Sequence, residues 1–497
     1  MTITLSKRRV FGGLAVLTAI LLVAGLLARQ ILAGLVVNAL LQLAGASEIK
    51  FTIAGVSPWR VVVEDIGFSV RTQSFAAKRV TFTRAHWWTP SLGSVRVEQA
   101  RVPLTVDGSD TNPFSWSTYQ NGQAKFQPWQ APLEELALDG RLVVKAAALP
   151  AQEVAVKLDA RLTSGNTWTG HVQADGPGLS VSGEGSYDLA RDELVFKLPA
   201  VALEVKAWQE FVRRIVLIPG GAWELEGKFA ASAEGRLAGK KLTTTGTVRL
   251  REGRASNPAL AVAAEGIEAD LEFTDFAQFT SKPGSLRIRE VRTGQLVLQD
   301  LDSVLAFAGP NKVAVSQATF RALGGTVAVE AFNYFLSLRE LETVVRVEGV
   351  DVAQVMALTK DLPAKAVGHV NGRFPIRIDD SGLRLGTGWL ELKPGVYAEI
   401  QLNANGLLTG GASPGSPSYA VLKKVESGLL KLRITELRLD IRPPNAPPGR
   451  SAQLHLVGEP VDPEVKAPVI LDLNVNGPLE RLINLGLDSR VSFGSKP

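Results

Sequence analysis

The chain has no cysteine among its 497 residues, and it has only four histidines and two methionines. The lack of cysteine excludes a disulfide framework, a thiolate metal site and a cysteine nucleophile. The sequence also contains no phosphate-binding glycine loop of the Walker type. The histidines are far apart and form no H-E-x-x-H motif; they are His86, His171, His369 and His455. We therefore expect no metal site and no cofactor.

One stretch matches the nucleophile pattern of a serine hydrolase. Residues 411–415 read G-A-S-P-G around Ser413, and Asp440 and His455 follow in the order of a hydrolase triad. The oxyanion hole of such an enzyme uses the backbone N–H of the residue after the serine, and Pro414 has no N–H. We interpret this stretch as a loop, and we predict that the protein is not an enzyme and has no catalytic residue.

Acidic residues are absent from the first 47 positions, whereas Lys7, Arg8 and Arg9 precede an uncharged run from Val10 to Ala28. These 19 residues, at about 1.5 Å each in a helix, are long enough to cross a hydrocarbon core of about 30 Å. The basic residues favour a cytoplasmic N-terminus and place the rest of the chain across the membrane. The predicted anchor includes Val10, Leu14, Leu17, Leu21, Leu22, Leu26 and Ala28.

A cleaved signal peptide is the alternative to a retained anchor. Residues 44–46 read A-G-A, like a cleavage site, but they lie 18 residues beyond the uncharged run. That distance is long for a signal peptide and favours retention. Residues 31–43 keep the apolar spacing of a helix, which would either lie along the outer leaflet or cap the first strands.

The net charge of +5 is compatible with nucleic-acid binding, but its distribution is not. Basic and acidic residues alternate along the chain, and the basic pairs at 213–214, 240–241 and 423–424 are scattered. A nucleic-acid-binding face would concentrate them in a patch or stripe. We therefore expect no nucleic-acid partner.

Alternation of apolar and polar residues is abundant from about residue 50 to the end, with 47 glycines and 27 prolines between the runs. This period of two predicts strands with one apolar face. At Glu436 the alternation shifts by one residue, which predicts a β-bulge or a tight bend. Similar runs contain Val143, Leu158, Leu162, Val181, Leu194, Phe196, Leu225, Val248 and Leu250. The residues that we expect to line an apolar groove are Leu432, Ile434, Leu454, Leu456, Leu471, Leu473 and Val475.

The spacing of these runs predicts about 30 strands and only three short helices, near residues 208–218, 352–361 and 419–427. An open sheet rarely exceeds about 10 strands without curling or splitting. The chain is therefore all-β, either as several sandwiches or as one elongated, curled antiparallel sheet. In a sandwich a second sheet fills the apolar face, whereas in a curled sheet that face stays available to apolar ligands. Alternation alone leaves both architectures open.

An aromatic-rich region lies near the start of the β-rich part. It contains Trp87, Trp88, Trp116, Tyr119 and Trp129. These residues are typical of a membrane interface, where they would form a belt or lid at which lipid enters. They are equally compatible with a local core beneath a long loop.

Several motifs, in a particular order, resemble a known family. Residues 323–327 read L-G-G-T-V, residues 350–358 read V-D-V-A-Q-V-M-A-L, and residues 368–378 read G-H-V-N-G-R-F-P-I-R-I. They are followed by L-E-L-K-P-G at 390–395, Y-A-V-L at 419–422, L-H-L-V-G at 454–458 and L-N-V-N-G-P-L at 473–479. This order resembles the YdbH family of AsmA-like and TamB-like envelope proteins, in which the L-G-G-T-V stretch looks like a hairpin. The resemblance is closest over about residues 285–490, and residues 100–285 resemble the family only in their alternation.

The resemblance implies a repeating β-groove anchored in the inner membrane of a Gram-negative cell by a single span, with its body in the periplasm. Such a groove conducts phospholipids between the two membranes without catalysis. It implies three parts: an anchor with its basic tip and amphipathic extension (1–48), an N-terminal part of the groove (49–284) and a C-terminal part (285–497). It also implies a small outer-membrane lipoprotein as a partner at the C-terminal end.

A different class of function is also compatible with the sequence. A membrane-tethered β-protein can act as a scaffold that assists the assembly or secretion of outer-membrane proteins, using a strand edge to pair with its client. Crosslinking from the apolar face separates the two hypotheses, because a conduit would give lipid adducts and a scaffold protein adducts.

Overall fold

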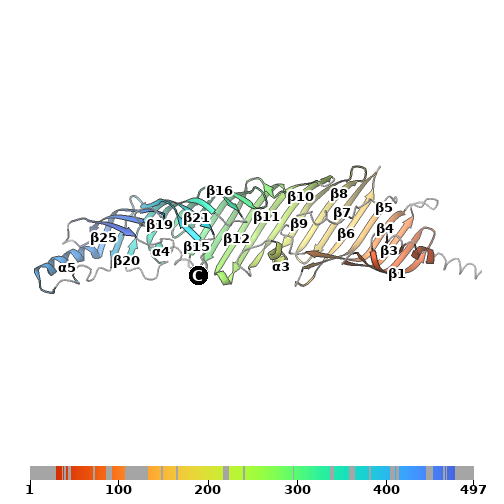
Figure 1. Cartoon of the computed structure of the whole chain (residues 1–497), viewed down its shortest axis with the longest axis horizontal. Coiled ribbons are helices and arrows are strands. Elements are labelled where there is room, and N and C mark those ends of the chain that lie inside the picture. Colours follow the sequence, from red (N-terminus) through yellow and green to blue (C-terminus); the bar gives the residue numbers. More distant parts are fainter. Residues whose placement is uncertain are drawn as a thin grey trace, which may run out of the picture. The chain divides into compact units, whose positions relative to one another are not determined.

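The protein is described here by a computed structural model (Figure 1). It describes residues 30–35, 37–38, 41–42, 46–70, 73–84, 92–106, 133–146, 149–163, 166–215, 223–238, 241–294, 296–335, 341–357, 364–379, 382–402, 409, 413–443, 452–462, 465 and 467–475. Within these residues there are 27 strands, β1 to β27, and few helices. The prediction of an all-β fold is confirmed.

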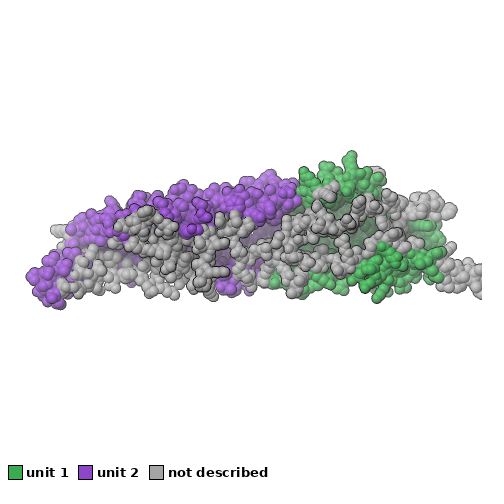
Figure 2. Space-filling model, viewed as in Figure 1, with its two compact units in different colours: residues 1–215, 231–244 green, residues 216–230, 245–497 purple. Residues whose placement is uncertain are grey.

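The chain divides into two compact units (Figure 2). Unit 1 comprises residues 1–215 and 231–244, and unit 2 comprises residues 216–230 and 245–497. The boundary between them therefore crosses β10 (Glu224–Ala238) and β11 (Lys241–Asn257). The three-part division expected from the family resemblance, with its boundary at residue 284, stays a prediction.

The sheet of unit 1 is open and curled, and neighbouring strands follow one another along the chain (Figure 1). Each strand except one pairs antiparallel with the next, as period-two alternation and short turns predict. The strands are β1 (Ala46–Val56), β2 (Arg60–Val70), β3 (Gln73–Arg84), β4 (Leu92–Val106), β5 (Leu133–Ala146), β6 (Gln152–Leu162), β7 (Thr167–Gly176), β8 (Leu179–Asp188) and β9 (Glu193–Glu204).

The exception in unit 1 is the pair β4–β5, which is parallel over the whole length of both strands. Gly140 on β5 is required there, because a Cβ at this position would lie 2.6 Å from the Cβ and the carbonyl oxygen of Ala100 on β4. We expected an antiparallel sheet throughout. The sequence did not predict this pair because alternation defines the faces of a strand and not its direction.

Unit 2 is likewise an open antiparallel sheet, with several split strands. For example, β16 pairs with β17 along one half and with β18 along the other. The strands after β11 are β12 (Val262–Asp275), β13 (Thr280–Ser281), β14 (Gly284–Thr293), β15 (Leu296–Phe307), β16 (Lys312–Ala322), β17 (Gly325–Val329), β18 (Phe332–Phe335), β19 (Leu341–Asp351), β20 (Ala364–Val367), β21 (His369–Asp379), β22 (Gly382–Leu385), β23 (Gly388–Leu392), β24 (Glu399–Leu402), β25 (Lys431–Ile441), β26 (Ala452–Pro460) and β27 (Val469–Val475).

Two local predictions in unit 2 are confirmed. The L-G-G-T-V stretch forms the hairpin between β16 and β17, in which Leu323 (φ 50°) and Gly324 (φ 73°) are both left-handed. Such a two-residue turn favours glycine because positive φ strains other residues. The predicted shift of alternation in β25 is a bulge between Ile434 and Glu436.

The three helices expected within the β-rich part are present. They are α3 (Val205–Ile215), α4 (Val352–Ala357) and α5 (Pro417–Leu430). Helix α5 begins at Ser416, whose side-chain oxygen accepts a hydrogen bond from the backbone N–H of Tyr419, with Pro417 at the first helical position. A one-turn helical segment, η1 (Pro258–Leu260), also follows β11.

A further helix, at residues 30–35 and continuing at 37–38 and 41–42, precedes β1. The predicted anchor from Val10 to Ala28, with Lys7, Arg8 and Arg9, lies outside the described residues. Among the helices that the structure describes, none combines the length and apolar character needed to cross a membrane.

Candidate functional site

The strands of unit 1 from β6 to β9 direct most of their large apolar residues to one face of the sheet, which we call the inner face; Val195 on β9 is exposed on the other face. On β6, Val154, Val156, Leu158, Ala160 and Leu162 point to this face. Ala155, Lys157, Asp159 and Arg161, which alternate with them, are exposed on the other side. On neighbouring strands, inner-face residues pair with one another and form rows across the sheet. One row is Val156, Ala174, Val181 and Val201, and a second row is Leu162, Trp168, Tyr187 and Leu194.

Both rows are half-buried rather than buried. A core position between two packed sheets would be almost fully enclosed. Val156 and Ala174 of the first row pack against the cluster that includes Trp208 and Phe211 of the helix at Val205–Ile215, and part of the surface of both rows stays accessible. In the described part of unit 1 the inner face of β6–β9 is thus an apolar surface without a second sheet over it, which corresponds to the curled sheet and not to the sandwich.

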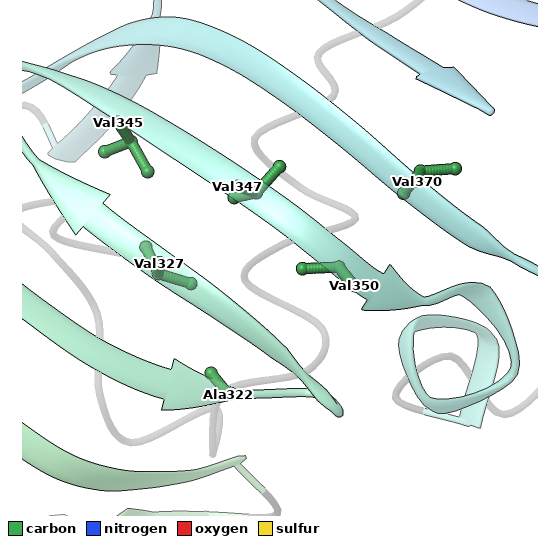
Figure 3. Packing of buried hydrophobic residues seen from close by; sticks show 6 residues of the cluster. All are labelled: Ala322, Val327, Val345, Val347, Val350 and Val370. Carbon is green, nitrogen blue, oxygen red and sulfur yellow. The ribbon is translucent and has the colours of Figure 1, made fainter. Parts of the chain in front are cut away.

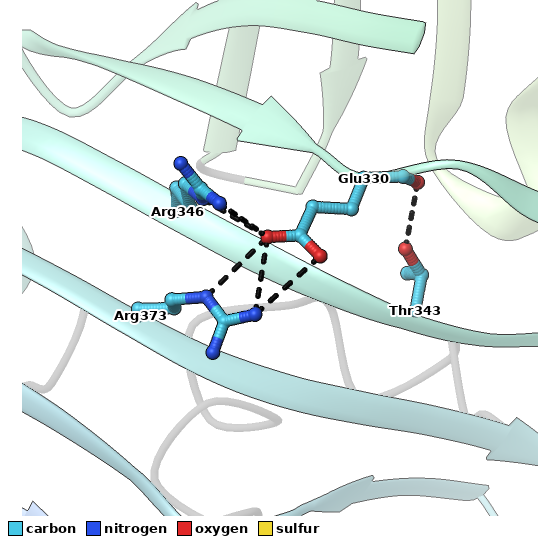
Figure 4. Close-up of polar contacts among 4 residues, drawn as sticks. All are labelled: Glu330, Thr343, Arg346 and Arg373. Atoms are coloured by element: carbon cyan, nitrogen blue, oxygen red, sulfur yellow. Dashed lines mark hydrogen bonds and ion pairs between the residues drawn. The ribbon is translucent and has the colours of Figure 1, made fainter. Parts of the chain in front are cut away.

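The opposite, outer face of the strands carries ion pairs between adjacent strands. Glu153 on β6 accepts from Arg141 on β5 and from Arg101 on β4, both at 2.9 Å. In unit 2, Glu330 accepts from Arg346 on β19 and Arg373 on β21 (Figure 4). The hydrogen bond from Arg346, with the nearby charges of both arginines, lowers the pKa of Glu330. One face of each sheet is therefore charged and the other is aliphatic.

Helix α3 covers one end of the inner face in unit 1. Trp208 and Phe211 are buried against Val144 and Val154, and the Trp208 Nε1–H donates to the carbonyl oxygen of Pro177 at 2.8 Å. The other end of the same strands, at Leu162 and Tyr187, has no such cover among the described residues of unit 1.

Tyr187 stands at this uncovered end of the inner face. Its hydroxyl donates to Asp192 at 2.7 Å, and partial burial together with this bond raises its pKa to about 12. With Trp168 beside it on β7, it places an aromatic side chain with a polar tip where the apolar surface meets solvent.

Unit 2 also has an apolar cluster on one face of its sheet, but the members of this cluster are buried rather than half-buried (Figure 3). All of its members come from strands that are direct neighbours in one sheet, β16, β17, β19 and β21. No second sheet contributes to it within the described residues. The buried members are Ala322, Val327, Val345, Val347, Val350 and Val370.

The groove residues predicted near the C-terminal end are partly brought together. Leu432, Ile434 and Leu456 are 0 %, 7 % and 2 % exposed and form one cluster, against which Leu471 packs. Leu454 is half-buried on the same face of β26. The backbones of Leu473 and Val475 pair with Leu454 and Ala452, but their side chains lie outside the described residues.

This burial changes the role that we assign to the C-terminal residues. A side chain with no exposed surface, such as Leu432, stabilises the sheet and cannot contact a guest molecule. Helix α5 packs against β24, β25 and β26 at this place. It is fastened by Glu426, which accepts from the N–H and the hydroxyl of Thr409, and by Ser427, whose hydroxyl donates to Asp462 at 3.0 Å.

The accessible residues of β6–β9 were missing from the predicted groove set. The signal was present, since Leu158, Leu162, Val181 and Leu194 lie in recognisable alternating runs. The sequence pattern alone does not distinguish an apolar row that another element covers from one that stays uncovered.

The described residues contain no cluster of histidine, aspartate or glutamate that would hold a metal ion. His171, His369 and His455 lie on different strands, and His86 is outside the described residues. His455 pairs through Nδ1 with Asp472 at 2.7 Å, whereas Asp440 accepts from Arg438. No hydrogen bond joins Ser413 to His455 in the described part, so the hydrolase-like stretch is not assembled as a triad there.

The aromatic-rich region predicted as a belt, lid or local core is not part of the described structure. Trp87, Trp88, Trp116, Tyr119 and Trp129 all lie outside the described residues.

Comparison with known proteins gives one family. A family model described as YdbH-like, intermembrane phospholipid transport protein YdbH, matches residues 24–396. The match includes residues 100–285, which resembled the family only in alternation, and it stops before α5 and the strands β24–β27. No curated protein and no solved structure matches the chain.

Proposed function

The chain belongs to the YdbH-like family, and from this and its uncovered apolar face we propose that it conducts phospholipids between membranes along the inner face of its sheets. The observation that carries the proposal is the pair of half-buried rows of aliphatic and aromatic residues on β6–β9, opposite a face of ion pairs. Acyl chains would lie against these rows while the headgroups stay in water.

Physical chemistry supports this use of the inner face. Moving an acyl chain through water costs about 0.8 kcal/mol for each exposed CH₂ group, which makes spontaneous transfer slow. A continuous aliphatic surface lowers that cost at every step. It needs no specific residue at any one position, only alternation, and no catalytic group.

Membrane attachment and location belong to the same proposal. The uncharged run from Val10 to Ala28, preceded by Lys7, Arg8 and Arg9, supports a single span in the inner membrane with the N-terminus in the cytoplasm and the sheets in the periplasm. Phospholipids are the proposed cargo. A small outer-membrane lipoprotein at the C-terminal end is the proposed partner, and it rests on the family resemblance alone.

The proposal is tested by photo-crosslinking in cells from two adjacent positions on β6. A crosslinking amino acid replaces Leu158, which points to the inner face, or Lys157, which points to the outer face. We expect phospholipid adducts from position 158 and far fewer from position 157. Both positions lie on one strand, so differences in abundance or folding affect them alike.

Two outcomes would contradict the proposal. Equal lipid adducts at both positions would show that lipid contact does not follow the apolar face. Protein adducts alone at position 158 would favour the membrane-tethered scaffold, because the inner face would then bind a client chain.

A further inference from the structure

The helix before β1 is apolar on two sides. One side packs on the inner face of the first strands, where Val37 (8 % exposed) and Leu41 join the cluster around Val63 and Ile66. The other side is exposed, and its apolar residues Ile31, Leu32 and Leu35 are 65 %, 61 % and 61 % exposed. A surface helix normally carries polar residues on the side away from the core.

A second exposed group lies at one end of the first three strands. Trp59, in the turn between β1 and β2, is 53 % exposed, and its carbonyl oxygen accepts from the N–H of Arg84 at 2.9 Å. Arg60 stands opposite Thr83, next to Arg84. Both arginines are exposed, and neither forms an ion pair with another described residue.

Of the exposed helix residues, Ile31 and Leu32 lie on the side of Gly34 that faces this end of the strands, and Leu35 lies beside Gly34. Gly34 lies beside Phe51 and Ile53, in the middle of β1. A Cβ added to Gly34 would be 3.8 Å from a ring carbon of Phe51 and 3.9 Å from a side-chain carbon of Ile53. From there the chain must reach the start of β1 at Ala46. The helix therefore runs away from the β1–β2 turn, and its first residues are its nearest to Trp59.

We propose that Ile31, Leu32, Leu35, Trp59, Arg60 and Arg84 form a surface that binds an anionic phospholipid bilayer. We call it the N-terminal bilayer surface. The apolar residues would enter the boundary between headgroups and acyl chains, about 5–10 Å deep, and the two arginines would bind headgroup phosphates. Tryptophan and arginine suit this interface because each combines an apolar body with a polar or charged tip.

Two features of the chain select a bilayer rather than another protein as the occupant. The described helix begins two residues after the uncharged run that ends at Ala28, so any membrane that holds this run lies next to Ile31. The positive charges of Arg60 and Arg84, which form no ion pair among the described residues, complement anionic headgroups. The inference rests on the membrane attachment in the proposed function and adds where the sheet contacts the bilayer.

The consequence is a defined place for lipid entry. The helix packs on the inner face of β1 and β2, so a bilayer bound at its exposed side borders the start of that face. Lipids would then pass from the bilayer to the apolar face without crossing bulk water.

The chain has no cysteine, so a single introduced cysteine can carry a fluorescent probe without further changes. We would place the probe in Leu35→Cys, Trp59→Cys and Ser74→Cys variants of the full chain, reconstituted in nanodiscs of phosphatidylglycerol and phosphatidylethanolamine. Ser74 is exposed on the β2–β3 hairpin at the end away from Trp59, about 30 Å along the strands, and is the matched control.

We expect nitroxide-labelled lipids to quench the probes at positions 35 and 59 at least about twofold more strongly than the probe at position 74. Equal quenching at all three positions, or none at 35 and 59, would overturn the proposal. Quenching at 35 without quenching at 59 would also overturn it, because lipid would then contact the helix within the groove and not at a bilayer surface.

The electrostatic part is tested with Arg60→Glu and Arg84→Glu together in the Trp59→Cys chain. We expect the quenching at position 59 to decrease on anionic nanodiscs and to change little on zwitterionic ones. Unchanged quenching on anionic nanodiscs would overturn the assignment of these arginines to headgroups. Adducts at Leu158 are read separately, so a failure here is distinguishable from a failure of the proposed function.

Discussion

Strands β6–β9 and the C-terminal strands β24–β27 have the same alternation and opposite degrees of burial. On β6–β9 the apolar residues of the inner face, such as Leu158 and Val181, are half-buried. On β25 and β26 their counterparts Leu432 and Leu456 are almost completely buried in a cluster beside α5. The same alternation of apolar and polar residues therefore produces an accessible surface in one region and a buried core in the other.

The difference lies in what packs on each inner face. Helix α3 covers one end of β6–β9 and leaves the other end accessible in the described structure. At the C-terminal end α5 packs against β24, β25 and β26, and hydrogen bonds join Glu426 to Thr409 and Ser427 to Asp462. Under the proposed function, guest molecules would contact the inner face of β6–β9, and the C-terminal cluster would mainly stabilise the sheet.

The largest effect should follow from charging the closed region. Leu432→Asp places a carboxylate at a position with no exposed surface and should destabilise unit 2 by about 4 kcal/mol. The control is Thr435→Asp, three residues along the same strand and exposed. Urea unfolding of both variants checks this. If Leu432→Asp unfolds like the control, the C-terminal cluster is accessible and the comparison is wrong.

By the same reasoning, Leu456→Asp does not serve as a test of lipid passage. At 2 % exposure this substitution would disturb folding first, so a loss of transport would not identify a lipid contact.

A smaller effect is expected where the parallel strands β4 and β5 approach each other. Gly140→Val adds a Cβ that would lie only 2.6 Å from the Cβ of Ala100, so the substitution should lower the free energy of unfolding by about 2 kcal/mol. Gly55→Ala, at a glycine with open space around it, is the control and should be nearly neutral. Thermal unfolding measures both. Equal stability of the two variants would contradict the parallel pairing.

A charged residue on the accessible inner face of β6 should have a still smaller effect on stability. Its effect on lipid transfer should be large. Leu158→Asp should cost about 1 kcal/mol of stability, since its side chain is already half in water. Lipid transfer should decrease about tenfold or more, because a charge in an apolar path opposes acyl chains. Ala155→Asp, exposed on the outer face of the same strand, should transfer normally. Exchange of a fluorescent phospholipid between vesicles is the measurement, and equal rates would reject the inner face as the path.

The smallest effect concerns the charged outer face, at Glu330. The folded-state pKa of Glu330 is lowered by the hydrogen bond from Arg346 and by Arg373. These bonds therefore stabilise the folded protein fully at pH values above the unfolded-state pKa of the carboxyl group. That contribution is lost as pH falls through the folded-state pKa. Glu330→Gln should therefore lower the melting temperature slightly at neutral pH and not at strongly acidic pH, and added salt should reduce the difference. A difference that grows on acidification would contradict this assignment.

Much of the local structure follows from the chain alone. Alternation gave the correct faces of β25 and β26, the bulge after Ile434 and the hairpin at Leu323–Gly324 were predicted, and the three helices are present near their expected residues. These features depend on residues close in sequence, whose side chains alternate because of the extended backbone itself.

Three features depended on contacts between distant residues. The parallel pairing of β4 with β5, the cover of α3 over Val144 and Val154, and the complete burial of Leu432 each join segments that no local pattern connects. Alternation identifies an apolar face because it is a property of one strand. Whether water, lipid or the protein's own helix meets that face is decided only when the strands and helices pack together.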